Sequence, residues 1–202
     1  MKIKLNYILL LLVIATNSCK KNDDDSNIPS NCTNITGWLK NGHQFVYVNE
    51  PILFFADTLT TTIEEVSAGV FKGTNVFDDG STYPSFSGYT KPCGNDIYSA
   101  ADVAMSNASV TYHVDGNIND TWSSVATSLG GYKVTNTYKI TGKNISVTVP
   151  AGTFSCLKIN VVSVSTQPGA LTVITDIYLN NESGMIKTDG NTTHYELARK
   201  NF

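Results

Sequence analysis

Apolar and polar residues alternate along short stretches of the chain, which predicts β-strands. In Tyr132–Thr141, apolar side chains occupy every second position but one. A period of two is that of a half-buried strand, whereas a helix would scatter both sets of residues around its axis. Gly142 and Lys143 then predict a turn, and alternation resumes over Ile145–Val149 until Pro150. The pattern therefore predicts a hairpin.

The rest of the chain shows the same pattern, which makes the predicted fold mainly β. A turn at Asn41 and Gly42 predicts a hairpin between Trp38 and the return strand of Phe45, whereas Asp96–Met105 fits either a short helix or a strand. We expect about ten strands and at most one or two short helices. They would form a strongly curved antiparallel sheet or half-open barrel, because open sheet edges promote aggregation. Further strands are predicted at Ile63–Val66, Val70–Phe77, Val110–Val114, Phe154–Val164, Leu171–Leu179, Met185–Thr188 and Thr193–Ala198.

The N-terminus has the layout of a signal peptide over residues 1–18. Lys2 and Lys4 precede the apolar run Tyr7–Ala15, which is too short to cross a hydrocarbon core of about 30 Å. Cys19 follows the small residue Ser18, as in a bacterial lipobox, where the cysteine is diacylated on sulfur and becomes the new N-terminus. Cys19 is thus the predicted lipid anchor. The alternative is an ordinary secretory signal followed by a coincidental cysteine.

The next residues predict a polar tether ahead of the folded domain. Lys20–Asn31 contains almost no apolar side chain, and extended it would reach about 40 Å. Its run of aspartates resembles the charged stretch that marks Bacteroidota lipoproteins for the outer face of the outer membrane, although a solvated spacer explains it equally well. We expect a lipidated tether over residues 19–31 and one β domain over residues 32–202, since this length suits a single core.

Composition and charge limit the kinds of partner that we expect for this protein. Only 15% of the residues are charged, and 24 Thr, 20 Asn and 18 Ser make uncharged polar groups the main surface chemistry. The net charge is -3 with a pI near 5.5. Such a chain does not concentrate on a phosphate backbone, so we do not expect nucleic acid as a partner.

With Cys19 acylated, three cysteines remain in an oxidising compartment and cannot all pair within the chain. Cys32 and Cys93 lie in turn-rich stretches and form the preferred disulfide. Cys156 lies in a predicted strand and would be a small buried apolar residue. A bridge from Cys93 to Cys156 is the rival pairing. No histidine lies near Cys156 in sequence, so we do not expect a catalytic thiol.

The sequence contains no motif that specifies a reaction, a cofactor or a metal. His43, His113 and His194 are far apart, and each is expected to be solvent-exposed. The stretch Asp115–Asp120 alternates oxygen side chains as a calcium loop does, but Asp120 stands where such a loop needs glycine. We interpret it as a polar turn. Nucleophile-elbow, P-loop and dinucleotide motifs are absent from the sequence.

Several stretches carry a resemblance to a known family. Val147–Phe154, followed by Leu157–Ile159, is similar to the V-x-V-P-A-G-T-F…K-I signature of TapB-like bacterial lipoproteins of uncharacterised function, and Gly116–Trp122 resembles that family's G-D-T-W turn. Met185–Lys187 and the later Tyr195–Leu197 look like its closing pattern. The resemblance implies a curved antiparallel sheet, reminiscent of the periplasmic carriers that escort lipoproteins. Cys19 and the aspartate run predict a lipid-anchored protein of the outer membrane, and they leave open whether it faces the cell surface. It supplies no catalytic residues.

Three functions follow as hypotheses. The first is a non-enzymatic, lipid-anchored envelope protein whose β domain binds an unknown protein or supports an assembly. The second is a carrier of a lipid or other hydrophobic ligand, because aromatic residues such as Trp38, Phe45, Phe54 and Tyr138 could line a concave sheet face. The third is a hydrolase, which requires His113 or His194 to meet a carboxylate in a cleft.

Overall fold

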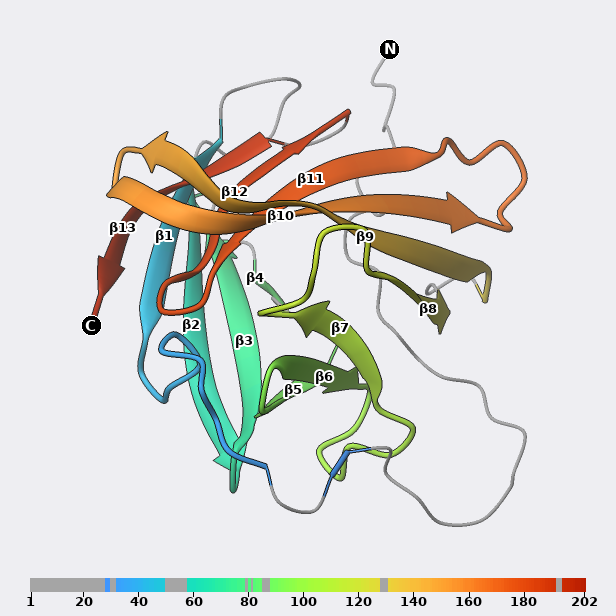
Figure 1. Ribbon diagram of the computed structural model, residues 1–202. Helices are drawn as coiled ribbons and strands as arrows, with labels where there is room; N and C mark the ends of the chain where they lie inside the picture. The colour runs from blue at the N-terminus through green and yellow to red at the C-terminus, as the bar shows by residue number, and fades with distance from the viewer. Residues whose placement is uncertain are drawn as a thin grey trace.

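Thirteen strands form one antiparallel sheet in the computed structural model (Figure 1). The structure describes residues 28–29, 32–49, 58–78, 80, 82–84, 88–127, 131–191 and 194–202, and within these ranges it contains no helix, so no helix there could cross a membrane. Residues 1–27, with the predicted signal peptide and Cys19, lie outside the description. The strands are β1 (Gln44–Asn49), β2 (Thr58–Ser67), β3 (Val70–Phe77), β4 (Thr82–Pro84), β5 (Tyr89–Cys93), β6 (Asp96–Ala100), β7 (Ser109–His113), β8 (Thr121–Thr127), β9 (Lys133–Val149), β10 (Gly152–Ser165), β11 (Val173–Asn180), β12 (Gly184–Gly190) and β13 (His194–Asn201).

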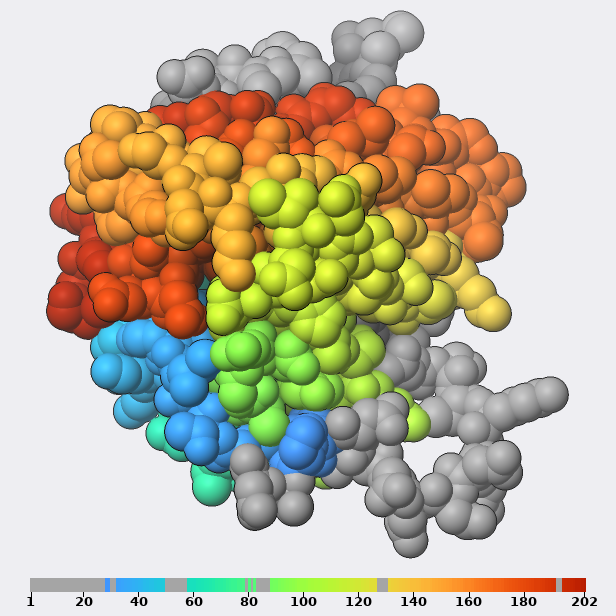
Figure 2. Space-filling view, in the orientation of Figure 1, coloured from blue at the N-terminus to red at the C-terminus, as the bar shows by residue number. Residues whose placement is uncertain are grey.

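The sheet curls until its two end strands meet. Its order is β7-β6-β5-β3-β2-β1-β13-β12-β11-β10-β9-β8, with β4 paired to β3 alone. The indole Nε1–H of Trp122 in β8 donates to the backbone oxygen of Thr111 in β7 at 3.3 Å, so side chains bring these two ends together. In Figure 2 the segment between β7 and β8 (yellow-green) covers the front of the molecule. The predicted antiparallel curved sheet is confirmed, but it has more than ten strands and is nearly closed.

The predicted turn at Gly142 and Lys143 is wrong. Strand β9 continues through both residues and pairs with β10 on either side of them. The register shifts at this point, and Asn144 takes a left-handed φ of 56°, as expected of an extra residue at a β-bulge. The extra residue of a bulge shifts the apolar residues from odd to even positions or the reverse. A turn has the same effect, so the sequence pattern cannot distinguish a bulge from a turn.

The predicted hairpin at Asn41 and Gly42 is half right. The turn forms, with Gly42 at a φ of 81° and the His43 N–H donating to the Lys40 oxygen at 3.2 Å. Trp38, however, is not in a strand, and β1 pairs instead with β2 and β13. The stretch that fitted helix or strand forms β6 and then a series of turns.

Two apolar cores lie on opposite faces of the sheet. The larger core fills the concave side and includes Phe71 and Ile97, whereas their neighbours Val70 and Tyr98 belong to a second, smaller core. Successive side chains of a strand point to opposite faces, so the second core lies on the convex side of β3, β5 and β6. The most buried members of the concave core are Leu39, Phe45, Ile63, Ile97, Ile140, Cys156, Ile159, Ile186 and Leu197.

Candidate functional site

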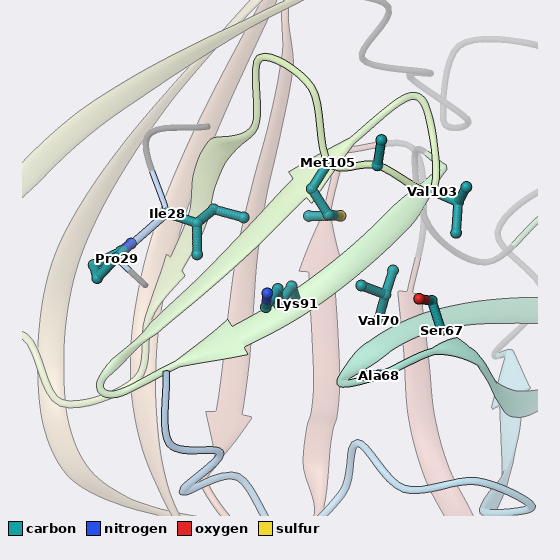
Figure 3. Close-up of a pocket in the computed structure, with 9 residues that line it drawn as sticks. Ile28, Pro29, Ser67, Ala68, Val70, Lys91, Val103 and Met105 are labelled. Carbon is teal, nitrogen blue, oxygen red and sulfur yellow. The ribbon is translucent and has the colours of Figure 1, made fainter. Parts of the chain in front are cut away.

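A pocket of about 330 Å³ lies on the convex side of the sheet beside the second core (Figure 3). The turn between β2 and β3 forms one wall, and the loop after β6 forms another. The first described residues of the chain complete the lining. Apolar residues supply most of the lining, but the surface open to the pocket is mainly polar, and Lys91 of β5 contributes a positive charge. The lining residues are Ile28, Pro29, Ser67, Ala68, Val70, Lys91, Val103, Ala104 and Met105.

The loop after β6 has a fixed conformation at the pocket. The carboxylate of Asp102 accepts a hydrogen bond from the N–H of Ser106 at 3.1 Å, and its backbone oxygen accepts one from the N–H of Met105, also at 3.1 Å. Met105 takes a left-handed φ of 59°, which costs about 1–3 kcal/mol in a residue other than glycine. The Met105 side chain is buried in the second core, and this packing offsets the strain.

The N-terminal residues are fastened to the same face. Ile28 is buried in the second core, although the sequence assigned it to the tether. A disulfide joins Cys32 to Cys93 at the end of β5, which is the pair preferred from the sequence. The N–H of Gly94 donates to the backbone oxygen of Thr33 at 2.9 Å. The first described residues are therefore packed on the convex face, with a covalent link from Cys32 to the sheet.

His113 lies where the two ends of the sheet meet. Its Nδ1 is 2.6 Å from Oδ1 of Asp96, its register partner across β6 and β7, and both side chains are partly buried. The imidazole packs edge to face on Trp122, which stacks on Tyr138. The expected exposed histidine is wrong here, because its cross-strand partner is a carboxylate. The resulting His–Asp pair braces the closure of the sheet.

His194 is also buried among charged groups. Its Nδ1 is 3.4 Å from Asp189, and its Nε2 is 3.3 Å from Glu196. Glu196 also pairs with Lys187 at 3.0 Å. Partial burial opposes protonation of Lys187, but Glu196, Asp189 and Tyr178 together outweigh it, and the pKa of Lys187 is raised. The expectation of exposure is wrong for His194 as well, and the group is a cross-strand charge cluster on β12 and β13.

His43 packs near the C-terminus, away from the other two histidines. Its ring stacks on Phe202 with 4.0 Å between centroids, and its Nδ1 lies 3.2 Å from the backbone oxygen of Trp38. Burial lowers the pKa of His43, which the Trp38 oxygen only partly offsets. The three histidines therefore belong to three separate environments.

The oxygen-rich stretch Asp115–Asp120 forms a turn. The carboxylate of Asp120 accepts a hydrogen bond from the N–H of Asn117 at 2.6 Å, and Asp115 forms an ion pair with Lys143 at 2.8 Å. Its two carboxylates are thus used in local contacts. Within the described ranges, no group of three or more His, Cys, Asp or Glu side chains is arranged to hold a metal ion.

Cys156 is a free, buried thiol in β10. It packs within the concave core and is 1% exposed. Burial raises the pKa of Cys156 to about 11, which suppresses the reactive thiolate. The side chain acts as a small apolar residue of the core.

The concave face is packed with aromatic side chains. The hydroxyl of Tyr47 donates to the backbone oxygen of Met185 at 3.1 Å, and the hydroxyls of Tyr138 and Ser124 lie 3.3 Å apart. Burial raises the pKa of Tyr47, Tyr112 and Tyr138. Tyr47 and Tyr138 hydrogen-bond, and all three tyrosines pack with the larger core, so their side chains occupy part of the concave face.

Comparisons with known proteins identify the fold. No protein-family model matches the chain, and no curated protein matches its sequence. A crystal structure of a candidate lipoprotein from Parabacteroides distasonis matches with a TM-score of 0.53 and 14% identity, covering 85% of this chain and 100% of that one. A candidate exported protein with a YmcC-like fold from Bacteroides fragilis matches with a TM-score of 0.55 and 12% identity, covering 84% and 100%. The likeness shows a shared fold, and the TapB-like resemblance stays a prediction.

The sequence did not reveal the pocket or the partner of His113. Lys91 and Met105 carry no motif, and they meet only because the loop after β6 folds back over β5. Asp96 could have been found from strand pairing, since it lies directly opposite His113 in the ladder. Finding Asp96 in this way requires knowing that the stretch after Asn95 is a strand. The alanines of this stretch also fit a helix, so the sequence did not decide between the two.

Proposed function

We propose that this chain is a lipid-anchored protein of the bacterial cell envelope whose β domain binds a partner or supports an assembly without catalysing a reaction. Cys19 would be its anchor, and the outer membrane, at the cell surface, its location. The observation that carries the proposal is the position of Cys19, between an apolar export segment and a domain whose start is held by a disulfide.

The disulfide supports export. Cys32 and Cys93 are 61 residues apart in sequence and are joined on the convex face, beside the second core that contains Ile28. Stable structural disulfides form in oxidising compartments such as the periplasm and the cell surface. The shared fold adds to this, because the two similar structures are described as a candidate lipoprotein and a candidate exported protein.

The side-chain arrangement favours binding over catalysis. The two His–carboxylate groups, at His113 and His194, lie at cross-strand positions where they pair with their ladder neighbours. Cys156 is buried with a raised pKa, which is the opposite of an activated nucleophile. A carrier of hydrophobic ligands is the second candidate, but the packed concave core leaves it less support than a binding surface.

Intact mass spectrometry of the protein purified from its own membranes tests the proposal. We expect a chain that begins at Cys19 and carries the mass of a diacylglyceryl group, with or without a third acyl chain. A Cys19→Ser variant should lose this mass and appear in the soluble fraction, because stable anchoring depends on two or more buried acyl chains. A native chain with an unmodified Cys19, recovered free in the medium, would contradict the anchor. A ligand retained at stoichiometric amount would favour the carrier.

A further inference from the structure

The point at which the chain enters the domain restricts how an anchored domain can stand on a membrane. Ile28 is buried in the second core, and the disulfide of Cys32 holds the following residues on the same face. Only Lys20–Asn27 separate Cys19 from Ile28 in the sequence. Fully extended, the chain from Cys19 to Ile28 reaches about 30 Å.

This reach is shorter than the domain. A compact domain of this size has a radius of gyration of about 15 Å, which corresponds to a diameter of ~40 Å. Turning the domain over would place Ile28 about 40 Å from the headgroups, beyond the reach of the chain. In Figures 1 and 2 the described N-terminal residues (blue) lie at the lower edge, whereas β10 and β11 lie at the opposite edge. The lower edge must therefore stay close to the anchor.

The chemistry of this edge suits contact with lipid headgroups. Val66 and Val103 are 36% and 45% exposed beside the pocket, and Lys91 provides a positive charge within it. Two carboxylates nearby are held in turns, since Glu65 accepts a hydrogen bond from the N–H of Gly69 at 2.8 Å and Asp102 accepts one from Ser106. Exposed apolar groups with a nearby cation match the boundary between headgroups and acyl chains.

We propose that the β2–β3 turn, the loop after β6 and the pocket between them form the membrane-facing surface of the domain. Lipid headgroups are the occupant of this surface, and Lys91 faces their phosphates. The edge of the domain that contains β10 and β11 then points away from the membrane, where a partner can reach it. This orientation rests on the proposed acylation of Cys19, because the argument needs the chain to be fixed to the bilayer at that residue.

Site-specific labels on the acylated protein test the orientation. Val103→Cys and Leu171→Cys each place one exposed thiol, at the two opposite ends, while Cys156 stays buried. The labelled proteins are reconstituted in phosphatidylcholine vesicles that contain a small fraction of rhodamine-labelled phosphatidylethanolamine. Energy transfer from residue 103 should exceed that from residue 171 by about two-fold or more, because a domain diameter of ~40 Å separates the two positions.

A flexible insertion tests whether the short tether causes the difference in energy transfer between residues 103 and 171. Twelve Gly/Ser residues between Asn27 and Ile28 should bring the two transfer efficiencies closer together, because the longer chain permits inversion. The same insertion after Gly169, in the turn between β10 and β11, is the matched control and should leave the difference unchanged. Equal transfer from both positions in the uninserted chain would overturn the orientation while the anchor stands. Failure of the native chain to float with vesicles would overturn the anchor and, with it, the orientation.

Discussion

At the scale of single residues, burial decides the chemistry of groups that look reactive in the sequence. Cys156 and His194 carry functional groups that often serve catalysis, yet Cys156 packs within the core and His194 pairs across two strands. Burial disfavours the charged thiolate, whereas a neighbouring carboxylate pairs with an imidazole. The residue's neighbours in the fold, rather than its type, therefore determine its role.

Cys156 should be unreactive until the protein unfolds. With a pKa of about 11, the native thiol is only ~0.1% thiolate at pH 8, and it is also shielded by the core. A thiol-reactive dye added to the mature acylated protein should label no cysteine under native conditions and one in denaturant without reductant. Adding reductant to the denatured protein should expose three. Rapid labelling of the native protein would contradict the buried position of Cys156.

The residue-level site could be predicted only in part. The preference for Cys32 and Cys93 came from their turn-rich surroundings, and the structure joins this pair. The exposed state expected for His113 and His194 was wrong, because each has a carboxylate opposite it on a neighbouring strand. Such pairs depend on the register between strands, which a single sequence does not display.

At the scale of elements, alternation located most strands and failed where the backbone departs from the regular ladder. Val70–Phe77 was predicted with its observed bounds, because turn residues limit it on both sides. Strand β9 was divided in two, since the bulge at Asn144 shifts the phase of alternation just as a turn would. A change of phase thus identifies an irregularity without identifying its type.

The left-handed backbone at Asn144 restricts which residues this position of the bulge accepts. Asn144 is exposed and has a φ of 56°, so a β-branched residue there would be strained without a change in core packing. Asn144→Val should lower the free energy of unfolding by about 1–2 kcal/mol. Asn144→Gly is the matched control and should be neutral or slightly stabilising. Chemical denaturation measures both, and equal stability of the two variants would show that the strand continues without a left-handed residue.

At the scale of the whole molecule, two kinds of closure hold the sheet together. β1 pairs with β13, so the two halves of the chain share one continuous ladder. β7 and β8 lie at the ends of that order and meet through Trp122, Thr111 and His113. The avoidance of open sheet edges predicted the curvature and a half-open barrel, but the nearly complete closure could not be predicted, because it depends on side chains at the two ends of the sheet.

The Cys32–Cys93 disulfide should contribute strongly to the stability of the whole domain. It closes a segment of 61 residues that contains β1 to β5, and such a loop corresponds to about 4 kcal/mol of lost chain entropy in the unfolded state. The Cys32→Ser/Cys93→Ser double variant should therefore have a free energy of unfolding lower by up to about 4 kcal/mol, measured by urea denaturation.

Two comparisons identify the cause of that loss. Reduced native protein should match the double variant, because both lack the covalent bond, and a Cys156→Ala variant should keep the effect of reduction. The loss should also be accompanied by faster proteolysis near Ile28, whose packing in the second core depends on the bond that holds Cys32. A double variant that is as stable as the oxidised protein would mean that the noncovalent packing of Ile28 alone fixes the start of the domain, and that the disulfide is not needed to hold the anchored end to the sheet.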